Sequence, residues 1–186
     1  MLKKNLIVAF MFTLSVSGVF AQSKFFTKTG QVNFFSKASL EDIEAKNKTV
    51  TAVVDSKTGA VQFAIQMKGF EFEKQLMQQH FNENYVESDK FPKAEFKGTI
   101  VNNNEINYDK EGSYPAKVKG KLTIHGVTQD IETSGTVKVD GEFLKLESGF
   151  NILLSDYDIK IPSVVKEKIS NSIKINVDSK LEKLKG

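Results

Sequence analysis

The chain has 186 residues, of which 40% are hydrophobic, and its net charge is +3. This length and composition fit one domain with a short appendage and exclude a disordered polyelectrolyte. The sequence contains no Cys, and all 26 of its basic residues are Lys. Disulfides and thiolate chemistry are therefore excluded, and the absence of Arg disfavours bidentate recognition of nucleic acid or of a diphosphate group.

An export signal is predicted at the N-terminus. Lys3 and Lys4 precede an apolar run over residues 6–20, and Ala21 is a small residue suited to signal-peptidase cleavage. The run is short for a membrane span, and a retained anchor is the alternative. We expect residues 1–21 to be a signal peptide that is cleaved after Ala21. Residues 22–186 would then form a nearly neutral mature domain, periplasmic or secreted, without a nucleic-acid partner.

Hydrophobic and polar residues alternate through most of the remaining chain. Alternation of period two is typical of β-strands with one buried face. Strands are predicted near residues 32–36, 49–55, 61–68, 94–101, 117–124, 127–139, 144–152 and 173–181. Turn sequences such as Asp140-Gly141 separate neighbouring strands. Because closure removes exposed edges, we predict an all-β, eight-stranded antiparallel barrel, with a β-sandwich as the alternative.

Two segments break the alternation and are predicted to be short helices. The first, residues 73–84, carries four residues at helical spacing: Leu76, Met77, His80 and Phe81. The second covers residues 164–170, with Pro162 near its start and Ser163 as a candidate N-cap. An eight-stranded barrel leaves an interior that side chains can fill or that one slender ligand can occupy.

Three sequence blocks occur in a distinctive order. Residues 81–98 read FNENYVESDKFPKAEFKG, residues 120–128 read GKLTIHGVT, and residues 150–159 read FNILLSDYDI. Together they resemble the YceI-like family, and the resemblance extends over residues 26–181. It implies an exported, lipocalin-like barrel with a long apolar cavity for a polyisoprenoid lipid or a similar amphiphile, such as an isoprenoid quinone. The first strand, Gln31–Ser36, lacks the His-Ser pair found in many members.

Strand parity, taken with this resemblance, predicts the residues that surround such a ligand. The cavity wall is expected to comprise Val61, Phe63, Ile65, Met67, Phe96, Leu122, Ile124, Leu146 and Ile152. The first helix is expected to lie over an open end, where the mouth would comprise Phe70, Phe72, Leu76, Met77 and Phe81. Plain core packing is the alternative for each residue, and a register slip of one residue would exchange the two faces of a strand.

Few polar residues suggest chemistry. His80 and His125 are expected to be structural, with His125 bonded to a turn or a neighbouring carbonyl group. Asp156 and Asp158 would face one side of a strand, where they could form a carboxylate pair or bind calcium, although backbone or solvent contacts are the commoner arrangement. The remaining acidic cluster is expected to be a solvated loop: Glu83, Glu87 and Asp89.

The leading functional hypothesis is an exported carrier for an amphiphilic isoprenoid lipid, without catalytic residues, metal or cofactor. The lack of Arg favours a neutral or quinone-like head group. One alternative is a small hydrolase or isomerase with a polar cluster inside the barrel around His125 or Asp156. Another is a partner-binding module with a filled core. The sequence is also compatible with a homodimer.

Overall fold

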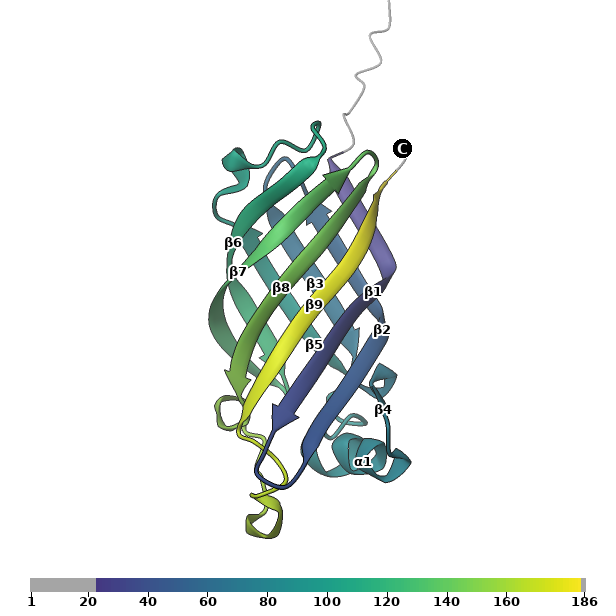
Figure 1. Cartoon of the computed structure of the whole chain (residues 1–186), viewed down its shortest axis with the longest axis vertical. Coiled ribbons are helices and arrows are strands. Elements are labelled where there is room, and N and C mark those ends of the chain that lie inside the picture. The colour runs from purple at the N-terminus through teal and green to yellow at the C-terminus, as the bar shows by residue number, and fades with distance from the viewer. Residues whose placement is uncertain (1–22, 185–186) are drawn as a thin grey trace, which may run out of the picture.

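The computed structural model describes residues 23–184, so the expected signal peptide lies outside the described residues. Eight long strands dominate it: β1 (Lys24–Lys37), β2 (Asp42–Asp55), β3 (Ala60–Gln66), β5 (Lys93–Ile100), β6 (Gly112–Ile124), β7 (Val127–Asp140), β8 (Phe143–Leu153) and β9 (Ser172–Lys183). They form one antiparallel sheet in the order β1-β9-β8-β7-β6-β5-β3-β2, and β2 pairs with β1 (Figure 1). This closure confirms the predicted eight-stranded barrel and excludes a sandwich.

The first two strands are longer than their sequence pattern indicates. β1 and β2 pair from Lys24 opposite Asp55 to Lys37 opposite Asp42. Register shifts on both sides of Gly30 interrupt this ladder. A bulge displaces the two-residue alternation, because the residues after it change faces relative to those before it. The sequence pattern consequently predicts only residues 32–36 of β1 and residues 49–55 of β2.

The connections at the two ends of the barrel differ in length. The β6–β7 turn at the lower end of Figure 1 contains only His125 and Gly126, with φ angles of 52° and 76°. Positive φ at both central residues defines a type I′ hairpin turn, which suits the twist of paired strands. A Cβ atom on residue 126 would lie 2.6 Å from the Phe91 ring, so this close approach also requires glycine.

The β3–β5 connection carries the predicted first helix. It contains η1 (Met67–Gly69), the short strand β4 (Glu71–Phe72), α1 (Gln75–His80) and η2 (Phe81–Tyr85). β4 adds to β2, and α1 continues into η2 beside the lower end of the barrel (Figure 1). The predicted helix over residues 73–84 is thus present, although it begins at Gln75. No helix in the described part of the chain is both long and apolar enough to cross a membrane.

The predicted helix over residues 164–170 is wrong. The β8–β9 connection contains η4 (Leu154–Tyr157) and only a single turn of 3₁₀-helix, η5 (Ser163–Val165). Pro162, rather than Ser163, occupies the N-cap position of η5, and no side chain caps this helix. Two adjacent β-branched valines and the missing capping bond disfavour a longer helix. The backbone carbonyl of Glu167 instead accepts a hydrogen bond from Leu40 N at 2.9 Å.

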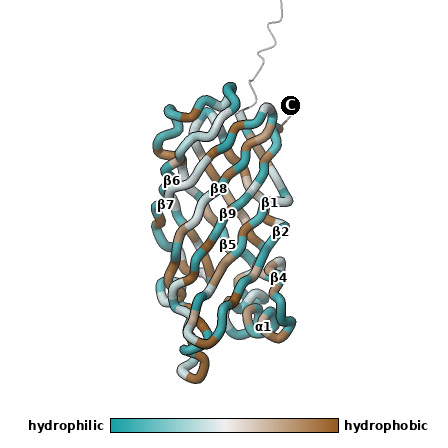
Figure 2. The backbone as a smooth tube through the Cα atoms, viewed as in Figure 1, coloured by the Kyte–Doolittle hydropathy of each residue, from teal (hydrophilic) through white to brown (hydrophobic). Residues whose placement is uncertain are grey.

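The core fills the upper end of the barrel. Phe25, Val54, Leu144 and Leu181 are all at most 2% exposed there. The β5–β6 connection, which includes η3 (Asn103–Glu105), adds Tyr108, whose ring centroid lies 6.4 Å from that of Phe25. Hydrophobic and hydrophilic residues alternate along the strands in Figure 2, as expected when one face of a sheet is buried.

Candidate functional site

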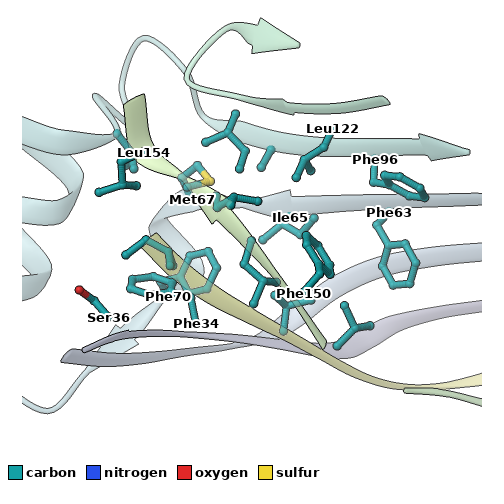
Figure 3. Close-up of a pocket in the computed structure, with 18 of the residues that line it drawn as sticks. Phe34, Ser36, Phe63, Ile65, Met67, Phe70, Phe96, Leu122, Phe150 and Leu154 are labelled. Carbon is teal, nitrogen blue, oxygen red and sulfur yellow. The ribbon is translucent and has the colours of Figure 1, made fainter. Parts of the chain in front are cut away.

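The barrel encloses a cavity of about 520 Å³ that extends from its lower end past the middle of the strands, to Ala116, Val137 and Leu146. Its lining is predominantly apolar and comes from all eight long strands and from α1, η2 and the β8–β9 connection. Figure 3 shows Ser36 and Leu154 toward one end of the cavity and Phe63 and Phe96 toward the other. A volume in this range fits a small-molecule site, since ligand pockets typically measure ~300–1,000 Å³.

Aligned side chains on three neighbouring strands form the inner part of the wall. Phe63 of β3 is opposite Phe96 of β5, which is opposite Leu122 of β6. A directly facing pair, Gly98 and Gly120, follows on β5 and β6, and a Cβ atom at either position would lie within 2.7 Å of the Phe96 ring. The two glycines therefore make room for that ring against the barrel wall.

The structure places every sequence-predicted site residue on this cavity. All nine predicted wall residues line it: Val61, Phe63, Ile65, Met67, Phe96, Leu122, Ile124, Leu146 and Ile152. So do the five predicted mouth residues: Phe70, Phe72, Leu76, Met77 and Phe81. Their contact with a ligand stays a prediction.

Four phenylalanine rings pack together at the mouth. Phe34 of β1 lies 5.3–5.8 Å, centroid to centroid, from Phe70, Phe72 and Phe81. Phe81 also lies 5.1 Å from Phe72 and 5.6 Å from Phe70. Tilted and edge-on ring pairs at such distances stabilise one another beyond the burial of their area. This cluster fastens α1, η2 and β4 to the barrel wall beside the cavity.

Several lining residues were not predicted from strand parity. β1 contributes Phe34 and Ser36, β5 contributes Ala94, and β9 contributes Ile173 and Ile175. On β9 the two-residue alternation does indicate an inward-facing row, because Ile173, Ile175 and Val177 share one parity. On β1 the adjacent pair Phe34 and Phe35 interrupts the alternation, so its parity is ambiguous.

Most charged residues of the lining lie at the mouth; the exception is Glu147, on β8 where it pairs with β7. Lys74 donates a 2.7 Å hydrogen bond to Glu41 Oε1 at the rim. This bond and the positive charges of Lys74 and Lys168 hold the pKa of Glu41 below its usual value, against the desolvation of its carboxylate. His80 is exposed and also lines the rim. Ser36 is buried, and its hydroxyl oxygen accepts a 3.0 Å bond from Ser170 N.

The barrel wall changes where β7 meets β8. These strands pair only from Gly135 opposite Ser148 to Asp140 opposite Phe143. Residues 127–134 of β7 and 149–153 of β8 lie beyond that ladder. The Ser148 hydroxyl donates to the Ser134 carbonyl oxygen at 2.9 Å and lies 3.3 Å from the Thr133 hydroxyl. These hydroxyls introduce a small polar area into an otherwise apolar wall.

His125 joins three connections at the lower end. Its Nδ1 lies 3.1 Å from the Tyr157 carbonyl oxygen, and its Nε2 lies 2.7 Å from Glu87 Oε2. The two ring nitrogens thus contact acceptors from two different connections. The carbonyl contact agrees with the structural role expected for His125. Glu87 lies in the loop after η2, and its side chain is 44% exposed; the hydrogen bond from His125 lowers the pKa of its carboxyl group.

The prediction that Asp156 and Asp158 share a strand face is wrong. Asp156 lies in η4, and Asp158 follows it in the left-handed region with a φ of 55°. Both residues are exposed. Neither Asp156 nor His125 lines the cavity, so the polar cluster that the enzyme hypothesis placed inside the barrel is not formed by these residues. Within residues 23–184, no group of three or more His, Asp or Glu residues could hold a metal ion.

Comparisons with known proteins agree with this architecture. The model of the YceI-like domain matches residues 7–181. A polyisoprenoid-binding domain from Saccharophagus degradans, implicated in plant cell wall breakdown, superposes with a TM-score of 0.76 at 14% identity, covering 88% of this chain and 99% of its own. BcnA from Burkholderia cenocepacia superposes with a TM-score of 0.66 at 19% identity, covering 81% of this chain and 95% of its own.

A YCEI protein from Campylobacter jejuni has the same fold, with a TM-score of 0.59 at 18% identity and coverage of 76% of this chain and 85% of its own. A comparison with curated protein sequences finds no match. The family match covers most of the chain, and the solved structures share the closed barrel described above. The chain belongs to the YceI-like family.

Proposed function

We propose that this protein binds one isoprenoid lipid, or a comparable amphiphile, in the barrel cavity and acts as an exported carrier. The observation that carries the proposal is the apolar cavity of about 520 Å³, which is lined from all eight strands. The polyisoprenoid-binding domain with the same fold supports this ligand class. The filled core required by the partner-binding alternative is at odds with the cavity.

Apolar burial alone is sufficient for useful affinity. Burying ~400 Å² of an isoprenoid chain contributes roughly 10 kcal/mol before the cost of association. That cost is ~4–15 kcal/mol, so a long chain can bind with few polar contacts. The phenylalanines and Met67 of the wall suit such a ligand, because they offer adaptable apolar contact area.

The polar end of the ligand would lie toward the mouth, where the charged side chains are. Lys74 is already paired with Glu41, and the chain has no Arg to form a bidentate contact with phosphate. A neutral or quinone-like head group therefore suits this rim better than a diphosphate. We propose no catalytic step, because the charged residues of the lining lie at the rim, apart from Glu147, which is paired with Lys138 and Lys145.

A matched pair of variants tests the binding role. Ala94 of β5 is buried and lines the cavity, whereas Ala64 of β3 does not line it. In Ala94→Phe the new ring should occupy cavity volume and reduce uptake of an added isoprenoid quinone by about tenfold or more. Ala64→Phe should retain wild-type uptake.

Native mass spectrometry of the purified protein provides the direct measurement, before and after organic extraction. A stoichiometric bound isoprenoid, lost from Ala94→Phe, is the expected result. A wild-type protein that emerges empty and takes up neither quinone nor polyprenol would overturn the proposal. The same spectra give the mass of the processed chain, and a mature chain beginning at Gln22 is expected from the proposed export signal.

A further inference from the structure

Large hydrophobic side chains are exposed around the mouth of the cavity. Leu40 is 66% exposed in the β1–β2 connection, Leu76 is 62% exposed on α1, and Val164 is 88% exposed in η5. We call these three residues the apolar rim. Exposed side chains of this size cost free energy in water, so their concentration around an opening needs an explanation.

The members of the apolar rim come from three connections that are fastened together. Leu40 N donates to the Glu167 carbonyl oxygen in the β8–β9 connection. Lys74, just before α1, is paired with Glu41 beside Leu40. Figure 1 shows these three connections at the same end of the barrel, and Figure 2 shows hydrophobic residues at the tip of the lowest one. The apolar rim is therefore one surface.

This surface is continuous with the cavity. Leu76 belongs to both the apolar rim and the cavity lining. Val165 lines the cavity, directly beside the exposed Val164. Apolar side chains consequently lead from the cavity wall to the outermost tip of the molecule.

Lysines flank the tip of the β8–β9 connection. Residues 160–168 contain Lys160, Lys166 and Lys168 against a single acidic residue, Glu167, and all four side chains are exposed. Aliphatic side chains bordered by lysines match the chemistry of an anionic lipid surface, where apolar groups enter the acyl boundary and lysines approach the phosphates. Protein interfaces instead centre on aromatic residues and Arg, and the exposed rim residues include neither.

We propose that the lower end of the barrel docks on an anionic lipid bilayer through the apolar rim. This inference rests on the proposed lipid-binding function and adds a partner to it. An isoprenoid chain would then pass between the acyl region of the bilayer and the cavity without crossing water. The transfer route follows Val164, Val165 and the cavity mouth.

The opposite end of the barrel provides a matched control. Val101 follows β5 in the β5–β6 connection and is 50% exposed, but it lines no part of the cavity. Val164→Asp and Leu40→Asp place a carboxylate in the apolar rim, while Val101→Asp places the same group at the far end. None of these residues lines the cavity, so uptake of ligand dispersed in dilute detergent should stay at the wild-type level in all three variants.

Vesicle co-sedimentation tests the docking surface. The wild-type protein should bind vesicles of phosphatidylcholine with phosphatidylglycerol, and added salt should weaken the binding. Val164→Asp and Leu40→Asp should each lower the fraction bound by about tenfold, whereas Val101→Asp should bind as the wild type does. Transfer of an isoprenoid quinone from these vesicles into the protein should fall in parallel.

Two results would overturn the docking surface and leave the binding role intact. In one, the wild-type protein takes up dispersed ligand but does not bind the vesicles, or binds them only after another protein is added. The other is equal vesicle binding by Val164→Asp and Val101→Asp. If no variant takes up dispersed ligand, and the wild type fails as well, then the proposed function itself is wrong.

Discussion

The two ends of the barrel follow one alternating pattern and yet are packed differently. At the upper end, Phe25, Leu144 and Leu181 meet with almost no exposed surface, and the β5–β6 connection inserts Ile106 and Tyr108 among them. At the lower end, side chains of similar size surround an empty volume. The connections differ accordingly: Phe70, Val86 and Ile159 of the lower ones are buried and line the cavity, whereas Ile106 and Tyr108 of the upper one do not line it.

Strand pairing also differs along the barrel. The β7–β8 ladder runs from Gly135 to Asp140, and the cavity lining includes Val137 and Leu146 of this ladder and continues past its end to Phe150. A complete ladder and an inserted connection make a rigid, filled end. At the lower end the β7–β8 ladder is missing and the connections line the cavity, so this end retains space for a ligand and an opening through which that ligand can pass.

Two buried leucines offer the strongest test of this contrast. Leu144 is fully buried in the filled end, whereas Leu122 is 5% exposed and lines the cavity. Leu144→Ala should lower the free energy of unfolding by about 2–5 kcal/mol, because it opens a new void in a packed region. Leu122→Ala only enlarges an existing cavity, so its cost should approach the transfer free energy of the lost methyl groups, about 2 kcal/mol.

Urea unfolding with equal slopes for the two variants would measure this difference. Equal losses of stability would contradict the contrast, since they would mean that Leu122 is as tightly packed as Leu144.

Adding volume should also destabilise the filled end more than the cavity. Ala52 is fully buried and does not line the cavity, so Ala52→Leu should overpack the barrel and cost about 1–3 kcal/mol. Ala94→Leu extends into the cavity and should be close to neutral. Thermal unfolding of both variants in the absence of ligand measures the two losses of stability. A large loss in Ala94→Leu would show that its surroundings cannot accept the added groups.

Acid should weaken the contact between Glu87 and His125 at the lower end. The hydrogen bond from His125 holds the pKa of Glu87 below its usual 4.5. A lowered folded-state pKa means that this contribution to stability is complete above about pH 4.5 and is lost as the pH falls through the lowered value. The melting temperature of Glu87→Gln should therefore be below that of the wild type at neutral pH, and the two should converge in acid.

The upper end provides a control that does not titrate in this range. Asn103 donates to the Ser56 carbonyl oxygen at 2.8 Å and accepts the Tyr108 hydroxyl at 2.7 Å. Burial raises the pKa of Tyr108 to about 12, so these bonds stay neutral in acid. The destabilisation caused by Asn103→Ala should keep its size between neutral and acidic pH. If the melting temperature of Glu87→Gln stays equally far below that of the wild type in acid, the proposed role of the carboxylate is contradicted.

The sequence predicts the barrel better than it predicts the cavity. Uninterrupted alternation placed Phe63, Phe96 and Leu122 on the correct face, but the same alternation fits a filled interior equally well. The conformations of the connections decide between the two, and they depend on contacts between distant residues. The hydrogen bond between Glu87 and His125 joins residues 38 positions apart, so no local sequence pattern predicts it. Phe34 was not predicted because Phe35 follows it directly, so alternation does not show which of the two faces inward.

The smallest expected effect concerns the seam between β7 and β8. Glu147 of β8 is paired with Lys138 of β7 at 2.7 Å and with Lys145 at 2.8 Å, close above the point where the two strands part. Hydrogen bonds from these lysines lower the pKa of Glu147 to about 2, so the contribution of the pairs is present above pH 4.5 and is lost as the pH falls toward 2.

Glu147→Gln should lower the melting temperature slightly at neutral pH and low salt. The difference from the wild type should vanish in high salt, because exposed ion pairs are screened. Lys46, which is paired with Glu44 away from this seam, allows the matched variant Glu44→Gln. If Glu147→Gln were far more destabilising than Glu44→Gln even in high salt, the seam itself, rather than the packed core above it, would limit the stability of the closed end.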